Sequence, residues 1–356
     1  MRSCKIVLAY AATFVCACAA GIVAQSGAQS GAQAGNTVAA HMTAAKTAAD
    51  DSWLILYSEL CGAAMGAGGR ASSLPAAAPA ATTPGGGAGR GRQAGPPPRE
   101  SWYRDPVKVF DNMYAFPTND VNAWAIKTSA GIIMIDATYD YSVKDLITDA
   151  MPKVGLDPKD IKYVVVTHGH GDHSAGAKFL QDTYGAKILM SEADWNLLAQ
   201  PARGGGAGSP VPKKEMVVTD GQKLTLGDTT ITMYLTPGHT LGTISLIIPA
   251  KDNGRTHMVA FWGGTAISRT SPYDNLVAYS SSARKFESAA AQAGADVLLS
   301  NHGRYIDFDK RVGANRANPA GPNAFILTPA RVSNYMQVAD HCAQAIALSQ
   351  AAAKTP

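Results

Sequence analysis

The pattern of apolar and polar positions divides the chain near Trp102. Beyond that residue, short apolar and β-branched runs alternate with stretches in which apolar residues recur at helical spacing. Runs that are nearly all apolar are typical of strands covered on both faces. In the first half of the region beyond Trp102, the pattern therefore predicts strands at 121–128, 131–136 and 162–167, with a helix at 142–154.

A second strand-rich half follows, and two helical segments close it. The pattern predicts strands at 225–226, 230–236, 243–248, 258–262 and 296–300, and helices at 281–293 and 330–350. Two β-rich halves with helices outside them favour a layered α/β fold. We expect an αββα sandwich of two mixed β-sheets flanked by helices, formed by a single domain over 101–350.

The segment before this domain has a different composition, since Ala, Gly, Ser, Gln and Pro crowd into it. Such a region buries too little apolar surface to offset its chain entropy, so 25–100 is read as a low-complexity N-terminal region. Within it, 25–50 is expected to be a disordered spacer and 63–99 a linker. Between them, apolar residues on one helical face predict a short helix near 52–62.

The beginning of the chain has the pattern of an export signal. Arg2 and Lys5 precede an uncharged, mostly apolar run from Ile6 to Ala24. A basic start before an apolar segment is typical of a secretory signal, so we expect a signal peptide at 1–24 and a periplasmic or secreted protein. An uncleaved membrane anchor and a lipid on Cys18 stay open as alternatives. Stable membrane association is expected only in those two cases.

The net charge bears on the partners that the protein is expected to bind. A formal net charge of +4 with 16% charged residues gives no dense basic surface, so we expect a small-molecule substrate and no nucleic acid.

Of the 5 cysteines, Cys61 and Cys342 lie beyond the predicted cleavage site. Two thiols in an oxidising compartment commonly pair, so a disulfide and two separate buried thiols are both open.

A dense group of metal-binding residue types follows the predicted strand at 162–167. The segment Thr-His-Gly-His-Gly-Asp-His supplies His168, His170, Asp172 and His173. The intervening glycines permit tight turns, so a loop at the end of a strand can aim all four side chains at one point. The chain has only 8 histidines, which makes chance clustering a poor explanation. Imidazole and carboxylate groups are ligands that zinc accepts.

Two further histidines follow later predicted strands. His239 lies in Thr-Pro-Gly-His-Thr after the strand at 230–236, and His302 lies in Ser-Asn-His-Gly after the strand at 296–300. Taken singly, each is more often a turn or core histidine. Together with the first group they complete six ligands.

These motifs resemble the signature of the metallo-β-lactamase superfamily, in which His-x-His-x-Asp-His is followed by a Gly-His and a late His at strand ends. The resemblance covers roughly 105–302 and implies the αββα fold. It also implies two zinc ions, Zn²⁺, with three protein ligands each. The first would be held by His168, His170 and His239, and the second by Asp172, His173 and His302.

Two departures from the superfamily pattern bear on the substrate. The predicted strand at 258–262 runs into Gly-Gly-Thr-Ala, without the bridging acid of glyoxalase II and most lactonase relatives and without a cysteine. In this respect the chain is similar to the third subclass of metallo-β-lactamases. In that subclass, serines that follow the same strand help to bind the carboxylate of the β-lactam drug. Here Thr265, Ser268 and Arg269 would replace them, or are ordinary loop residues.

The resemblance therefore implies a zinc-dependent hydrolase of the metallo-β-lactamase type. A hydroxide shared by the two ions would open the amide ring of a β-lactam, with Asp172 as the catalytic residue that orients it. A lactonase, or another small ester or amide hydrolase of the same fold, is the alternative. A non-catalytic zinc-stabilised domain is disfavoured, because six ligands over two ions leave open positions for water.

Overall fold

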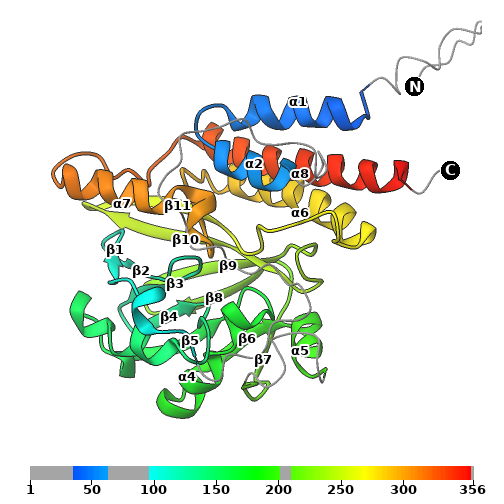
Figure 1. Ribbon diagram of the computed structural model, residues 1–356. Coiled ribbons are helices and arrows are strands. Elements are labelled where there is room, and N and C mark those ends of the chain that lie inside the picture. The colour runs from blue at the N-terminus through cyan, green and yellow to red at the C-terminus, as the bar shows by residue number, and fades with distance from the viewer. Residues whose placement is uncertain (1–34, 63–95, 201–209, 354–356) are drawn as a thin grey trace, which may run out of the picture. The chain divides into compact units, whose positions relative to one another are not determined.

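The computed structural model describes residues 35–62, 96–200 and 210–353. The predicted signal segment at 1–24, the lipid site at Cys18 and most of the predicted linker lie outside the described residues. The chain from Thr37 onward forms one compact unit. In it two β-sheets lie between layers of helices, so the predicted αββα sandwich is confirmed (Figure 1).

The first sheet has 7 strands in the order β1-β2-β3-β4-β5-β6-β7. Its strands are β1 (Val107–Lys108), β2 (Met113–Pro117), β3 (Asn122–Thr128), β4 (Gly131–Ile135), β5 (Ile161–Val165), β6 (Lys187–Ser191) and β7 (Met216–Val218). The pairs from β1 to β4 are antiparallel and those from β4 to β7 are parallel. Side chains alternate across the sheet, so Trp124 of β3 joins the larger core while Ala125 joins a separate outer core.

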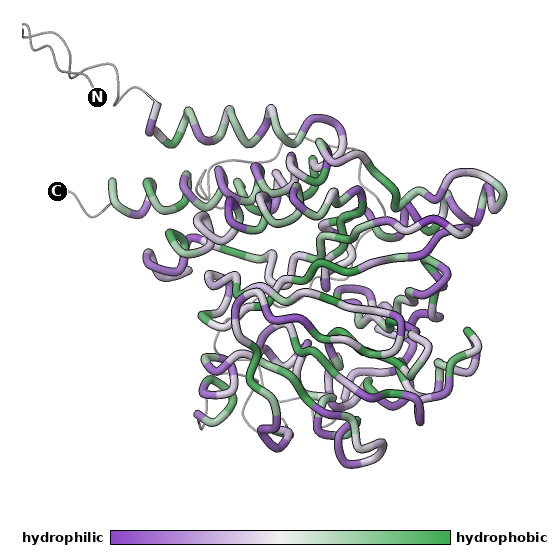
Figure 2. The backbone as a smooth tube through the Cα atoms, turned by 180° about the vertical axis from the view of Figure 1, so that it is seen from behind, coloured by the Kyte–Doolittle hydropathy of each residue, from purple (hydrophilic) through white to green (hydrophobic). Residues whose placement is uncertain are grey.

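The second sheet has 5 strands in the order β12-β11-β10-β9-β8. Its strands are β8 (Gln222–Leu226), β9 (Thr229–Leu235), β10 (Ile244–Asp252), β11 (Arg255–Trp262) and β12 (Val297–Ser300). Only the β11–β12 pair is parallel. Residues Trp124 and Phe261 meet edge to face in the core, with ring centroids 6.4 Å apart. Figure 2 shows hydrophobic residues gathered along the central strands and hydrophilic residues at many turns.

Two groups of helices cover the sheets. On the second sheet lie α6 (Tyr273–Gln292) and α8 (Pro329–Ala352), with α1 (Val38–Ala49) and α2 (Leu54–Gly62) packed on α8, and α7 (Phe308–Ala317) after the turn η5 (Gly303–Ile306) (Figure 1). On the first sheet lie α4 (Ala177–Tyr184), α5 (Glu192–Leu198) and the turns η2 (Lys144–Thr148) and η3 (Met151–Val154). The short elements η1 (Arg99–Ser101), η4 (Pro158–Asp160) and α3 (Gly171–Ser174) complete the elements of the described residues. No helix within the described ranges is long and apolar enough to cross a membrane.

Two sequence-based expectations about helices are wrong. The helix expected at 142–154 is a π-helical turn and a 3-10 turn, η2 and η3, and Pro152 is the second residue of η3. Proline lacks the N–H that a continuous α-helix needs. The spacer expected at 25–50 contains α1, which is capped by Thr37 and packs on α8. Alanine is the best helix former, so the many alanines of 25–50 are compatible with a helix as well as with a low-complexity spacer.

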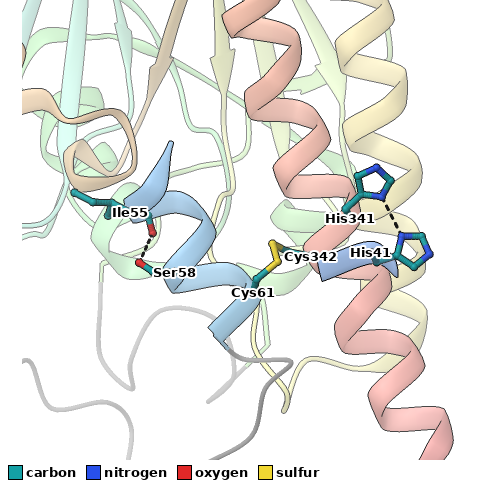
Figure 3. The surroundings of a disulfide bond; sticks show 6 residues. All are labelled: His41, Ile55, Ser58, Cys61, His341 and Cys342. Carbon is teal, nitrogen blue, oxygen red and sulfur yellow. Dashed lines mark hydrogen bonds between the residues drawn. A yellow bond between two sulfur atoms is a disulfide. The ribbon is translucent and has the colours of Figure 1, made fainter. Parts of the chain in front are cut away.

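A disulfide joins the N-terminal helices to the last helix. Cys61 of α2 and Cys342 of α8 are bonded, with their Cα atoms 4.7 Å apart (Figure 3). Of the two alternatives that the sequence left open, the structure has the disulfide. Beside it, His41 of α1 faces His341 of α8, with the two Nδ1 atoms 3.0 Å apart. The predicted short helix near 52–62 corresponds to α2.

Candidate metal centre

The loop after β5 brings the first group of histidines to the edge of the first sheet. Asp136, at the end of β4, accepts hydrogen bonds from the Thr167 backbone N–H (2.7 Å) and the Thr167 hydroxyl (3.0 Å). The chain then turns into α3, where the N–H of His173 donates to the carbonyl of His170 at 3.0 Å. This turn lets His168, His170, Asp172 and His173 project into one region, as the glycine-punctuated sequence predicts.

We call His168, His170 and His239 the first ligand set. The Nε2 atom of His239 lies 3.0 Å from Nδ1 of His170 and 3.1 Å from Nε2 of His168. Tetrahedral zinc with Zn–N bonds of about 2.1 Å places its ligand nitrogens about 3.4 Å apart. The three nitrogens therefore fit a metal ion after a small outward movement. Their side chains come from both sheets, because His239 lies between β9 and β10.

Burial keeps the first ligand set uncharged. It lowers the pKa of His239 to about 3, and neighbouring imidazoles add to this effect. The pKa of His168 is also held well below its usual range, by burial and then by the surrounding histidines. A metal ligand must be a deprotonated imidazole. These side chains are thus in the protonation state that metal binding requires.

We call Asp172, His173 and His302 the second ligand set. Nε2 of His173 lies 3.2 Å from Oδ2 of Asp172 and 3.3 Å from Nε2 of His302. The distance from His302 Nε2 to Asp172 Oδ2 is 3.8 Å. His302 follows β12, so this set also draws on both sheets. The two sets are adjacent, since ligand atoms of His168, Asp172 and His173 all lie within 4.8 Å of one another.

Charge distinguishes the second ligand set from the first. Burial by itself would lower the pKa of His173, but the carboxylates of Asp172 and Asp136 raise it to about 10. Burial works in the opposite direction on Asp172, yet the neighbouring histidines hold its pKa below the usual range. In the metal-free protein this set therefore contains an imidazolium–carboxylate pair. A cation that binds here must displace the proton of His173.

Backbone carbonyls orient two histidines of the first ligand set. Nδ1 of His168 lies 3.0 Å from the carbonyl oxygen of Gly263, and Nδ1 of His239 lies 2.5 Å from that of Ala266. Both carbonyls belong to the loop after β11. A partner on the far nitrogen fixes the tautomer and the ring orientation of a ligand histidine, so the Nε2 atoms are left free for a metal ion.

Carboxylates orient both histidines of the second ligand set. Nδ1 of His173 lies 2.8 Å from Oδ2 of Asp136, and Nδ1 of His302 lies 3.3 Å from Oδ1 of Asp120. The side-chain amide of Asn301 adds hydrogen bonds to Thr167 Oγ1 (2.9 Å) and the Gly263 carbonyl (2.7 Å). Sequence reasoning missed Asp120, Asp136 and Asn301. Only their positions next to predicted strand ends could have suggested them.

The Gly-Gly step after β11 leaves no space for a bridging side chain. A Cβ atom on Gly263 would lie 1.8 Å from the carbonyl oxygen of Ile244, and one on Gly264 would lie 2.8 Å from Cβ of His239. A metal-bridging acid at either position is therefore incompatible with this backbone. The donor set consists of the six side chains named above.

Comparisons with known proteins agree with this geometry. The sequence profile of the metallo-beta-lactamase superfamily matches residues 117–253. The crystal structure of BJP-1, a subclass B3 metallo-beta-lactamase of Bradyrhizobium japonicum, superposes with a TM-score of 0.60 at 28% identity, covering 71% of this chain and 98% of that one. The chain belongs to the metallo-beta-lactamase superfamily. Its solved structural neighbours include several subclass B3 enzymes.

Curated sequence relatives in the superfamily are more varied. An uncharacterized protein of Mycobacterium leprae is 33% identical over 122 residues, which is 30% of this chain and 51% of that protein. An acyl-coenzyme A thioesterase, MBLAC2, of Gallus gallus is 24% identical over 232 residues, which is 57% of this chain and 80% of that protein. The chain thus spans about half the length of the first of these relatives. The comparisons therefore agree on the metallo-beta-lactamase fold.

The structure corrects one expected substrate contact in this superfamily fold. Thr265 has an exposed fraction of 0%, and its hydroxyl lies 3.0 Å from Ser300 Oγ and 3.3 Å from the Tyr335 hydroxyl. Its side chain is therefore a core hydrogen-bonding group, not a substrate contact. Ser268 and Arg269 are exposed. Their contact with a substrate stays a prediction.

Asp194 is a further buried acid that sequence reasoning missed. It lies in the first turn of α5, after the N-cap Ser191, and has an exposed fraction of 0%. Burial raises its pKa to about 6, although hydrogen bonds from the Thr240 hydroxyl and from the backbone N–H groups of Gly169 and Gly242 counteract this. No metal-binding motif contains this residue, so only the folded chain reveals its position next to the first ligand set.

Proposed function

We propose that this protein is a zinc-dependent hydrolase that opens the amide ring of β-lactams. The observation that carries the proposal is the pair of adjacent three-residue ligand sets with no space for a bridging side chain after β11. The donors are imidazoles and one carboxylate, which suits zinc. The likeness to subclass B3 enzymes supports the β-lactam as substrate.

The side chains supply positioning and proton handling. Zinc bound by the two sets would lower the pKa of its water towards neutrality and polarise a substrate carbonyl. Asp172 stays ionised, because neighbouring histidines hold its pKa down. Its carboxylate lies at the second ligand set, where it would accept a hydrogen bond from the attacking water and orient it. The second ligand set, with an open position, would lie where the departing nitrogen gains charge.

Hydrolysis of another small ester, thioester or lactone is the second candidate. The relative named as an acyl-coenzyme A thioesterase, which aligns over 80% of its length, favours it. The same ligands and the same activated water would serve both reactions, because each begins with attack on a carbonyl carbon. The two candidates differ in the substrate groups that the loop around Ser268 and Arg269 would contact.

One panel of assays separates these candidates. Purified protein loaded with zinc is tested on a chromogenic cephalosporin, a carbapenem, an acyl lactone and an acyl-coenzyme A. We expect cephalosporin turnover that a chelator abolishes and zinc restores. Turnover confined to the lactone or the thioester would overturn the β-lactamase proposal and support the second candidate.

A ligand variant tests the metal chemistry itself. Asp172→Ala should lose turnover by more than the roughly 100-fold that follows loss of an outer hydrogen-bond partner, because it removes a ligand and the orienting carboxylate. The matched control is Asp182→Ala, which removes only the carboxylate of an exposed Lys178–Asp182 pair on α4. Normal hydrolysis by the Asp172 variant would contradict the mechanism.

We also propose export to a periplasmic or extracellular location. The basic and apolar start of the sequence supports it, and so does the Cys61–Cys342 disulfide. Disulfides persist mainly in oxidising compartments. Fractionation of cells that express the full chain tests this, and recovery of the protein in the cytoplasm with both thiols reduced would contradict it.

A further inference from the structure

Asp194 connects the two loops that deliver the first ligand set. Its Oδ2 accepts hydrogen bonds from the backbone N–H of Gly169 at 3.0 Å and from the hydroxyl of Thr240 at 2.8 Å. Gly169 lies between the ligands His168 and His170, and Thr240 follows the ligand His239. One carboxylate oxygen thus reaches the immediate chain neighbours of all three ligands.

The elements around Asp194 explain why it can do this. It lies in the first turn of α5, which follows β6, and β6 is the sheet neighbour of β5, the strand that leads to His168. Ser191 caps α5 by accepting a hydrogen bond from the Asp194 backbone N–H at 3.2 Å. The acid is therefore fixed to the first sheet, while Thr240 belongs to a loop of the second sheet.

Close packing holds the second loop against this carboxylate. A Cβ atom on Gly242 would lie 2.0 Å from Oγ of Ser191 and 2.7 Å from the carboxyl carbon of Asp194. Thr243 supports the same loop, since its hydroxyl accepts a hydrogen bond from the Thr240 backbone N–H at 3.1 Å. The loop that carries His239 thus rests directly on the start of α5.

The other carboxylate oxygen sets Asp194 apart from a simple structural acid. Oδ1 is buried and has no hydrogen-bond partner among the described residues. Burying a carboxylate oxygen without a partner costs free energy. Retaining an acid here at that cost is expected when its other oxygen has a specific task.

We propose that Asp194 is a positioning residue for the first ligand set, fixing the separation between the loop at 168–170 and the loop at 239–243. It does not touch the metal ion. Through Gly169 and Thr240 it holds three imidazole nitrogens close enough to share one ion. The inference rests on zinc binding at the first ligand set, as proposed above, and does not depend on which substrate is hydrolysed.

Zinc titrations in a background with one ligand set provide the test. Asp172→Ala removes a ligand of the second set, so the tightest zinc that remains reports on the first set. Adding Asp194→Ala should weaken this zinc by about 10- to 100-fold in competition with a chromogenic chelator. Asp194→Asn, which retains one acceptor oxygen, should weaken it less. The matched control is Asp340→Asn, a buried acid on α8 that bonds Ser280 and Arg284, and it should leave zinc affinity unchanged.

A second pair of variants keeps the test decisive if Asp194→Ala does not fold. Thr240→Val removes the hydroxyl that donates to Asp194, and Thr240→Ser keeps it. We expect weaker zinc binding in the Val variant and affinity like that of the background protein in the Ser variant. Thermal melting of each metal-free protein is recorded as the structural readout.

The outcomes separate this inference from the proposed function. If the unmodified protein binds no zinc, the proposed function fails and the inference falls with it. If the unmodified protein binds zinc but the Asp194 and Thr240→Val variants bind it equally well, only the inference is overturned. Equal zinc affinity together with a lower melting temperature would assign Asp194 a purely structural role and would also overturn it.

Discussion

In the first ligand set three uncharged imidazoles meet, whereas the second ligand set contains a carboxylate and a histidine that is protonated without metal. Their supports differ in the same way. Carbonyls of the loop after β11 orient the first set, and the carboxylates of Asp136 and Asp120 orient the second. The first set is thus adapted to bind a cation without proton release. The second balances the cation's charge with nearby acids.

Because of this difference, side-chain substitutions should distinguish metal binding at the first set from metal binding at the second. A backbone carbonyl stays in place when its own side chain changes, so substitutions outside the ligands act on the first set mainly through Asp194 and through Thr167, whose hydroxyl lies 3.1 Å from Nδ1 of His168. The orienting groups of the second set are side chains and can be removed singly. Metal affinity at the second set should therefore respond more strongly to substitutions outside the ligands.

The largest effect is expected from Asp136→Asn. Asp136 is fully buried and accepts hydrogen bonds from Thr167 and from Nδ1 of His173. Losing its charge should weaken zinc binding at the second ligand set by about 10- to 100-fold, because ligand histidines depend on such partners. The first equivalent should change little. Calorimetric titration of the metal-free protein with zinc measures both.

Asp120→Asn is the graded control for that result. Asp120 bonds His302 at 3.3 Å, and its side chain has an exposed fraction of 38%, so solvent competes for the same role. We expect a smaller loss than for Asp136→Asn, again confined to the second equivalent. Equal weakening of both equivalents by either variant would contradict the assignment of these acids to one set.

The next effect is a difference in pH dependence. Because the pKa of His173 is about 10 without metal, its imidazole is protonated at pH 7 and zinc must displace that proton. Affinity at the second set should fall about tenfold for each unit that the pH decreases near neutrality. The first set is already neutral there and should change little. Titrations in buffers of different ionisation enthalpy count the protons released, and equal release by both equivalents would contradict the comparison.

The smallest effect on the metal centre is expected from Thr265→Val. The variant removes a buried hydroxyl that bonds Ser300 and Tyr335, at a cost of about 1–3 kcal/mol of unfolding free energy. Neither zinc equivalent should change, and KM should stay the same because the hydroxyl does not face a substrate. Denaturant unfolding and steady-state kinetics measure these quantities. A large rise in KM with unchanged stability would restore Thr265 as a substrate contact.

The sequence predicted that these six candidate ligand side chains converge, because chemistry and chain order coincide in them. His168, His170, Asp172 and His173 lie in one short segment, and His239 and His302 each follow a recognisable strand. Spacing alone thus placed them at strand ends, which the fold then brought together. Eight strands were predictable for the same reason, since they are mostly apolar runs, whereas β1, β2, β6 and β7 of the first sheet were not predicted.

The supports of the site could not be predicted from the sequence. Asp120, Asp136 and Asp194 are isolated acids in segments far from the ligand motif, and their roles depend on which strands become neighbours in the sheet. The error on Thr265 has a related cause, because the sequence does not show whether a loop hydroxyl faces a substrate or the core. Helix α1 was missed because an alanine-rich segment reads as a spacer until a partner helix is known.

The bond between Cys61 and Cys342 connects residues separated by 281 positions in the chain. A single protease cut at any peptide bond between these two cysteines would leave both pieces covalently tethered. Such a nicked protein should migrate as one species on a denaturing gel without reductant and as two fragments with it. A backbone cut over most of the chain therefore leaves the molecule in one covalently connected piece.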